Sequence, residues 1–236
     1  MGFGHWKAPI WFVGIEEAGG QNVEDVQKRL QAWGEGGRKL LENALQFYSD
    51  SGNTSWHGAS AEIQATWKQL IRILLLAKGE ADTENAILNY QCNQLGSTNG
   101  ETCLMELLPL PSPNTGVWNY NQWSMLSWLR NRHSYFLKIL SRREAGLRQK
   151  ITEHKPQAVI FYGLVLPERK SLLPSWSSIA GGPFDQAFEK EKILLWRKNS
   201  ETLFIVMRHP VAERDAYFRR IGRWLHDRHK SRFNEK

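Results

Sequence analysis

Carboxylate and imidazole side chains follow two short apolar runs of this sequence. Glu16 and Glu17 come directly after the run at 10–15, and His209 comes soon after the run at 202–207. Such groups commonly move protons or stabilise developing charge in enzyme reactions. A histidine just beyond a buried strand is expected at the rim of a site and not in the core. These residues are therefore the first candidates for chemistry.

The chain around the two glutamates allows close approach of its backbone to a ligand. Gly14, Gly19 and Gly20 surround them, and glycine lets a backbone turn sharply. A further apolar run at 102–108 leads into segment 109–114, whose prolines hold the backbone extended. Both segments are expected at the edge of one site.

The elements that position these residues follow from the hydrophobic pattern. Near-continuous apolar runs predict strands buried on both faces, at 10–15, 102–108, 158–163 and 202–207. Helical periodicity lies between them, within 23–48 (interrupted near Gly34), 60–78, 83–95, 121–154 (with a kink near Gly146) and 211–232. This alternation predicts an α/β fold, a three-layer α/β/α sandwich with a four-stranded parallel core sheet.

Two connections complete the predicted sheet and its site. Residues 193–207 suggest a hairpin that adds one antiparallel strand, and 166–184 is predicted to be a long functional loop. Ligands of open α/β sheets bind beyond the carboxyl ends of the strands. The residues that follow all four core strands are therefore expected to share one site.

Composition narrows the function classes. The 236 residues carry a net charge of +7, which favours an anionic partner such as nucleic acid. Two cysteines, Cys92 and Cys103, exclude a disulfide scaffold and a cluster held by four cysteines. We expect a single domain over 1–236 with no cofactor and no metal. The sequence shows neither a signal peptide nor a membrane span, so we expect a cytoplasmic protein. We also expect a monomer.

Together these segments resemble the uracil-DNA glycosylase superfamily over about residues 8–220. The family's first motif follows the first strand and has forms such as Gly-Gln-Asp-Pro-Tyr-His or Gly-Ile-Asn-Pro-Gly, and its last motif is His-Pro-Ser or His-Pro-Ala. The corresponding segments here are 14–20, 106–114, Tyr162-Gly163 and His209-Pro210.

The resemblance implies a monofunctional DNA glycosylase, which flips a base out of the stack and hydrolyses its N-glycosidic bond. It assigns Glu16 to the water or the sugar cation, with Glu17 as the alternative, and His209 to the departing base. The implied base-binding residues are Gly14, Ile15, Gly19, Glu106 and Asn114. The implied DNA-binding residues are Pro111, Ser112, Arg208, Arg214, Arg219 and Arg220, several of them in the basic C-terminal helix at 211–232.

Two departures from the family pattern bear on the substrate. No bulky ring occurs at Ala18, Gly19 or Gly20, where uracil enzymes close the pocket. Glu106 replaces the asparagine that reads uracil, and an ionised carboxylate only accepts hydrogen bonds. Cytosine offers an amine donor, so both departures favour a modified and bulky cytosine of the kind found in phage DNA, and hence a role in antiviral defence. The alternative is a register shifted by one residue, with Glu106 directed elsewhere.

Two other functions remain open from the sequence. One is an ordinary uracil-DNA glycosylase of base-excision repair. The other is a non-catalytic nucleic-acid-binding module on the same fold, because a fold does not determine a function.

Overall fold

Four parallel strands form the centre of the sheet in the computed structural model, which describes residues 2–53, 55–58, 60–166, 171–187, 194–199 and 201–233. They are β2 (Ile10–Ala18), β4 (Thr102–Ser112), β5 (Ala158–Tyr162) and β8 (Leu203–Met207). Their order is β4-β2-β5-β8, and each adjacent pair is parallel. The four predicted core strands are confirmed.

The sheet is larger than the sequence predicted: the described residues form eight strands, in the order β3-β1-β4-β2-β5-β8-β7-β6. The expected hairpin is present, since β7 (Leu195–Lys198) pairs antiparallel with β8. Three strands were not predicted: β6 (Asp185–Gln186), β1 (Gly2–Phe3) and β3 (Leu41–Glu42). Each has two residues, too few for any periodic pattern to be recognised.

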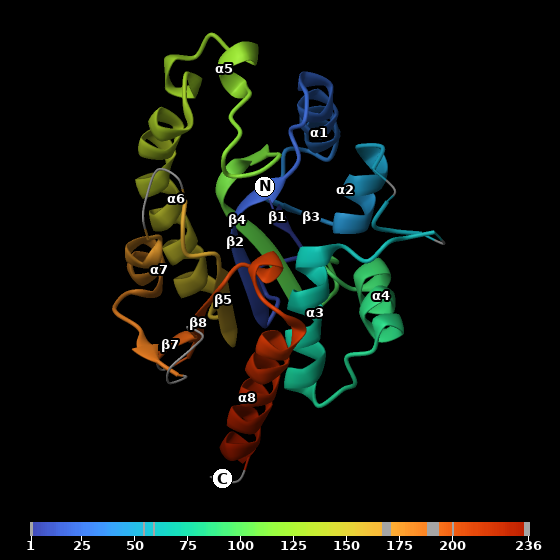
Figure 1. Cartoon of the computed structure of the whole chain (residues 1–236), viewed down its shortest axis with the longest axis vertical. Coiled ribbons are helices and arrows are strands. Elements are labelled where there is room, and N and C mark those ends of the chain that lie inside the picture. Colours follow the sequence, from blue (N-terminus) through green and yellow to red (C-terminus); the bar gives the residue numbers. More distant parts are fainter. Residues whose placement is uncertain are drawn as a thin grey trace.

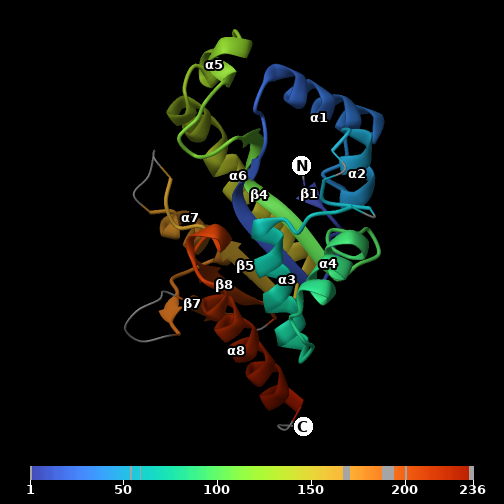
Figure 2. The ribbon, with the colours of Figure 1, turned by 45° about the vertical axis from the view of Figure 1, so that its right-hand side comes forward.

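Helices cover both faces of the sheet, an arrangement that fits a three-layer sandwich (Figures 1 and 2). One face packs on α6 (Arg132–His154) and α7 (Leu173–Ala180). The other packs on α2 (Ala44–Asp50), α3 (Ala65–Lys78), α4 (Glu84–Asn93) and α8 (Asp215–Phe233). The shorter helices are α5 (Tyr120–Trp123), η1 (Ser127–Leu129) and η2 (Pro210–Ala212), and α1 (Val23–Glu35) follows β2.

Alternation along the strands explains this packing. Trp11 and Val13 belong to the core under α6 and α7, whereas Phe12 belongs to the core under α3 and α8. All three side chains are fully buried, and burial of one such side chain contributes roughly 1.5–3 kcal/mol. A strand that is apolar on both sides must therefore lie between two helical layers.

The predicted helices differ in detail from the observed ones. Stretch 23–48 is interrupted as expected, and β3 lies between α1 and α2. Stretch 121–154 divides into short helices and α6, which passes Gly146 without a break. The predicted loop 166–184 contains α7, started by Pro174 in its first turn. That helix has only eight residues, and they include one proline and three serines. Its helical periodicity is therefore too short and too polar to be recognised in the sequence.

Strand order also determines where a ligand crevice forms. β2 and β5 are neighbours at the centre of the sheet. After β2 the chain continues to β4, on the far side of β2 from β5, and after β5 it continues to β8, on the far side of β5 from β2. Loops that leave adjacent strands in opposite directions open a crevice between them. In this sheet that point is the carboxyl end of β2 and β5.

Candidate functional site

A cavity of about 930 Å³ lies at this point, lined by residues at or just beyond the carboxyl ends of all four core strands. Ile15, Glu16 and Ala18 come from the end of β2. The segments after β4, β5 and β8 contribute Ser112 to Thr115, Gly163 to Val165, and Arg208 with His209. The predicted convergence of strand ends is therefore observed for Ile15, Glu16, Ser112, Asn114, Arg208 and His209.

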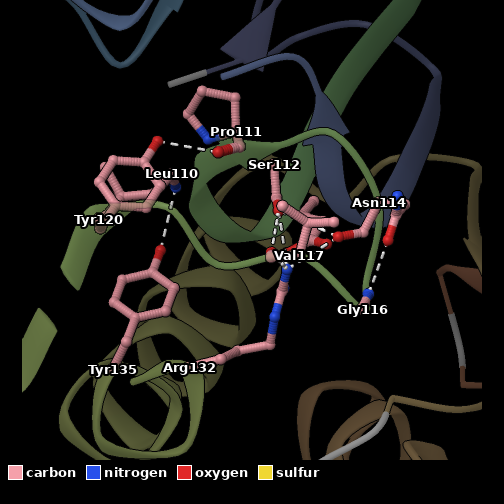
Figure 3. A network of polar contacts seen from close by, with 10 residues as sticks. Leu110, Pro111, Ser112, Asn114, Gly116, Val117, Tyr120, Arg132 and Tyr135 are labelled. Atoms are coloured by element: carbon pink, nitrogen blue, oxygen red, sulfur yellow. Dashed lines mark hydrogen bonds and ion pairs between the residues drawn. The ribbon is translucent and has the colours of Figure 1, made fainter. Parts of the chain in front are cut away.

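Glu16 is held at the cavity by a buried arginine, Arg132, at the start of α6. The two side chains form an ion pair, and each is only 5% exposed. The Arg132 guanidinium also donates to Ser112 Oγ at 2.7 Å, to the Asn114 carbonyl at 3.0 Å and to the Val117 carbonyl at 2.6 Å (Figure 3). One guanidinium thus ties the Glu16 carboxylate to the chain that follows β4.

His209 lies at the opposite flank of the cavity and caps η2. Its Nδ1 accepts a hydrogen bond from the Val211 backbone at 3.4 Å, so the neutral ring carries its proton on Nε2. Burial lowers the pKa of His209, which keeps the ring neutral near pH 7. The ring also meets Tyr162 edge-on, with centroids 5.8 Å apart. A neutral N–H donor therefore lies at the cavity.

Gly163 makes the close approach of β5 and β2 possible at this point. Its φ is +91°, a conformation that favours glycine, and a Cβ there would come within 2.5 Å of the Ile15 side chain. A side chain at this position would displace Ile15 from the cavity wall.

Glu17 has different surroundings from Glu16. It accepts hydrogen bonds from Arg29 at 2.5 Å and from the Tyr48 hydroxyl at 2.8 Å. It borders a separate cavity of about 240 Å³ between α1 and the end of β4, which Glu106 and Pro111 also line. The side chains of two adjacent glutamates therefore line two different cavities.

Glu106 lies in a row across the sheet with Gly14 and Tyr162. The Tyr162 hydroxyl donates to its Oε1 at 3.0 Å, and its buried Oε2 has no hydrogen-bond partner among the described residues. A Cβ on Gly14 would come within 2.2 Å of that Oε2, so glycine leaves the space that Glu106 fills.

The charge of Glu106 differs from the sequence-based expectation. Burial raises its pKa to about 8, the charges of Glu17 and Glu16 add to the rise, and the Tyr162 hydrogen bond opposes it. At pH 7 most molecules therefore hold a neutral carboxylic acid, which both donates and accepts. The premise of an ionised acceptor is corrected: a neutral acid can pair with the edge of either cytosine or uracil.

The glycine and proline segments occupy less exposed positions than their predicted roles suggest. Gly19 lines neither cavity, and a Cβ there would come within 2.7 Å of Arg29 Nη2. Ala18 is exposed and lines the main cavity. Pro111 and Ser112 are buried and take part in internal hydrogen bonds. The Asn114 side chain accepts from the Gly116 backbone at 2.9 Å, within a tight turn.

The predicted DNA-binding arginines separate into two groups. Arg208 lines the cavity, pairs with Glu213 at 3.0 Å and keeps 42% of its side chain exposed, and Arg214 and Arg220 are exposed. Arg219 pairs with Asp82 at 2.7 Å, and Arg72 reaches the same carboxylate at 2.7 Å. Arg219 therefore helps to join α8 to α3.

Arg132 was not singled out from the sequence, although one signal marks it. Asn131 caps α6 with its side chain, so Arg132 is the first helical residue. A positive charge is unfavourable at a helix N-terminus. An arginine in that place therefore indicates a nearby carboxylate partner, but the sequence does not identify Glu16, 116 positions away.

Neither metal ligation nor membrane insertion is indicated by the described part of the chain. Within it, no three His, Cys, Asp or Glu side chains are grouped so as to hold a metal ion. None of the helices described combines the length and apolarity needed to cross a bilayer. No model of a known protein family matches this chain, and no curated protein shows significant sequence similarity to it.

Proposed function

We propose that this chain is a monofunctional DNA glycosylase that acts on a base flipped into the cavity at the carboxyl ends of its core strands. One observation carries the proposal: Glu16 and the neutral His209 line the same cavity, from strands on either side of the crevice. Carboxylate and N–H donor are the pair that hydrolysis of an N-glycosidic bond requires.

In the proposed reaction the bond between the sugar C1′ and the base nitrogen breaks first. Its electron pair goes to the base, whose anion is stabilised by the His209 Nε2–H. The sugar becomes oxocarbenium-like, and the Glu16 carboxylate stabilises this cation and orients water against C1′. Water adds to C1′ and loses a proton to solvent, and the base anion takes up a proton, which leaves an abasic site and a free base. Because Arg132 pairs with Glu16, we assign Glu16 to electrostatic stabilisation and water orientation more than to strong general-base action.

For the substrate we propose a modified cytosine. Glu106 borders the smaller cavity with Glu17 and does not line the main one, so the proposed substrate rests on the main cavity and not on contact with Glu106. The size of the cavity and the exposed Ala18 at its edge leave room for a bulky substituent. A role in defence against phage with modified DNA is the proposed biological context.

Two rival functions each have one observation in their favour. Glu106, the residue expected to distinguish cytosine from uracil, lies outside the main cavity, which favours an ordinary uracil-DNA glycosylase as the rival enzyme. The internal ion pair of Glu16 favours a non-catalytic DNA-binding module, because the carboxylate already has a partner.

Release of free base from duplexes that differ at one position tests all three functions. We expect release from bulky modified cytosines to exceed release from uracil. Glu16→Gln and His209→Ala should each slow release by about a hundredfold or more. Glu17→Gln is the matched control, because Glu17 lies outside the main cavity, and it should change release by only a few-fold. Faster release of uracil would support the repair enzyme, and DNA binding without any release would support the binding module.

A further inference from the structure

The segment between β4 and α6, residues 113–131, leads from the cavity to the exterior. Asn114 and Thr115 line the cavity at its beginning. Arg132 holds the carbonyls of Asn114 and Val117, at 3.0 Å and 2.6 Å, so the base of the segment is anchored beside Glu16 (Figure 3). We refer to residues 113–131 as the bridging segment.

Aromatic side chains brace the bridging segment from inside. Trp118 packs between Tyr120 and Tyr135, with ring centroids 4.8 Å and 4.9 Å away. Trp123 meets Tyr120 at 5.5 Å, and Trp128 stacks on Tyr135 at 6.2 Å. The tyrosine hydroxyls bond to the backbone of β4, Tyr120 to the Pro111 carbonyl at 2.8 Å and Tyr135 to the Leu110 N–H at 3.0 Å (Figure 3).

The tip of the bridging segment presents two apolar side chains to the exterior. Met125 is fully exposed and Leu126 is 51% exposed, between the inward-packed Trp123 and Trp128. In both views α5, which lies just before this tip, stands beyond the carboxyl ends of the core strands (Figures 1 and 2). Adjacent exposed apolar residues on a braced support are typical of a contact surface.

Charge identifies the class of partner. The sequence contains no Asp or Glu between Glu106 and Glu144. Arg130, Lys138 and Arg142 are exposed, and none of them forms an ion pair with a residue that the structure describes. A stretch of chain without acidic residues that carries exposed cations is complementary to a polyanion.

Strand order places this surface next to the proposed flipped base. The bridging segment follows β4 and η2 follows β8, and β2 and β5 separate those strands. Three strand spacings put the carboxyl ends of β4 and β8, from which the two segments start, about 14 Å apart. Both can therefore meet the same duplex.

We propose that the bridging segment is a duplex-DNA contact whose tip residues, Met125 and Leu126, insert as an apolar wedge beside the flipped nucleotide. Apolar wedges of this kind partly unstack base steps and stabilise a distorted duplex. The position of the wedge relative to the flipped base rests on the proposed function. Contact with DNA does not, because it requires no catalysis.

Binding of the full chain to a short duplex tests the wedge. The variant Met125→Ser/Leu126→Ser is compared with wild type by fluorescence anisotropy, with 2-aminopurine beside a mismatched base as a probe of unstacking. We expect affinity to fall about tenfold and the 2-aminopurine signal to be lost. The control is Leu45→Ser, because Leu45 is 48% exposed on α2, away from α5 (Figures 1 and 2). It should bind as wild type does, and thermal unfolding checks that all three proteins fold.

Two results would overturn the wedge: unchanged DNA affinity of the folded double variant, or binding of anionic phospholipid vesicles that needs the tip while DNA binding does not. Measurement of base release separates this inference from the proposed function. If wild type binds DNA through the tip and releases no base, the glycosylase proposal fails and the wedge stands. If base is released and the double variant binds normally, the wedge fails and the glycosylase proposal stands.

Discussion

Adjacent glutamates at the end of β2 illustrate how strongly surroundings determine chemistry. Glu16 faces Arg132 at the main cavity, whereas Glu17 faces Arg29 and Tyr48 at the smaller one. The pairing of β2 with β4 is irregular between Glu16 and Ala18, which is where the two side chains diverge. Glu106, which borders the smaller cavity with Glu17, has no cation partner among the described residues, and burial raises its pKa to about 8.

Glu106 should make the stability of the protein depend on pH. Its folded-state pKa of about 8 is above the ordinary value for glutamate, so between these values the folded state keeps a proton that the unfolded chain has lost. Stability is then greatest below the ordinary pKa and falls as pH rises through about 8. Compared with Glu106→Gln, wild type should lose on the order of 1 kcal/mol per pH unit across this window. Urea unfolding of both proteins at a series of pH values measures this.

Other titrating groups do not obscure that comparison. The pKa of His209 is lowered by burial, but the histidine is present in both proteins and its contribution cancels. Parallel stability curves for wild type and Glu106→Gln would show that the Glu106 carboxyl ionises normally in the folded state.

Three elements meet at Arg132, the first residue of α6. Its guanidinium connects the end of β2, through Glu16, to the chain that follows β4. Removing one partner of a buried ion pair leaves the other charge unpaired, which costs about 3–5 kcal/mol. We therefore expect Arg132→Met to destabilise the protein by about that amount.

A double-mutant cycle tests whether this cost comes from the ion pair. The variant Glu16→Gln/Arg132→Met should lose less stability than the sum of the single variants, with a coupling energy of at least about 1 kcal/mol by urea unfolding. The surface pair Lys150–Glu153 provides the comparison, since solvent screens it and its cycle should give a smaller coupling energy. Additive losses at Glu16 and Arg132 would mean that they stabilise the fold independently.

Strand β2 continues past its neighbour β5 and carries Ala18 to the cavity. It pairs with β5 over 10–13 and with β4 as far as Ala18, opposite Ser112. A ring at this exposed position should narrow the cavity. With Ala18→Tyr, we expect release of bulky modified cytosines to fall by about 10-fold to 200-fold relative to small bases. The measure is the ratio of kcat/KM values for a large and a small substituent, and Ala18→Ser should leave it unchanged.

Gly19 is unsuitable for the same test. Its φ of +149° is a conformation that side chains rarely adopt, and a Cβ would meet the Arg29 guanidinium. A Tyr there would strain the backbone, so lost activity would not report on pocket size. If Ala18→Tyr left the ratio of kcat/KM values for large and small substituents unchanged, the substituent would have to lie elsewhere in the cavity.

The whole molecule carries a net charge of +7, and we expect its DNA affinity to depend steeply on salt. About four phosphate contacts would weaken binding on the order of a hundredfold between about 50 and 200 mM salt. Arg214→Gln should reduce the slope of log affinity against log salt by about one, because Arg214 is exposed near the cavity-lining η2. Arg219→Gln should leave the slope unchanged and lower stability, since Arg219 pairs with Asp82. If the two variants gave equal slopes of log affinity against log salt, Arg214 would not contact DNA.

The core of the fold is encoded locally. Runs such as 10–15 and 158–163 are apolar on both faces, so each must become a strand between two helical layers. Strands of a parallel sheet end at the same edge, which is why Glu16, Asn114 and His209 could be assigned to one site from their places after strands. That inference needed no knowledge of distant contacts.

Other properties were decided only when distant segments came together. The pairing of Glu16 with Arg132 depends on how α6 packs against the sheet, which no local pattern records. The neutral state of Glu106 depends on burial beside Gly14 and Tyr162, in strands far apart in the sequence. Strands of two residues form because a neighbouring strand offers unpaired backbone groups, as β4 does for β1. The protonation state of Glu106, the ion-pair partner of Glu16 and the pairing of the short strands all result from contacts between distant segments. A local sequence pattern contains no information about such contacts.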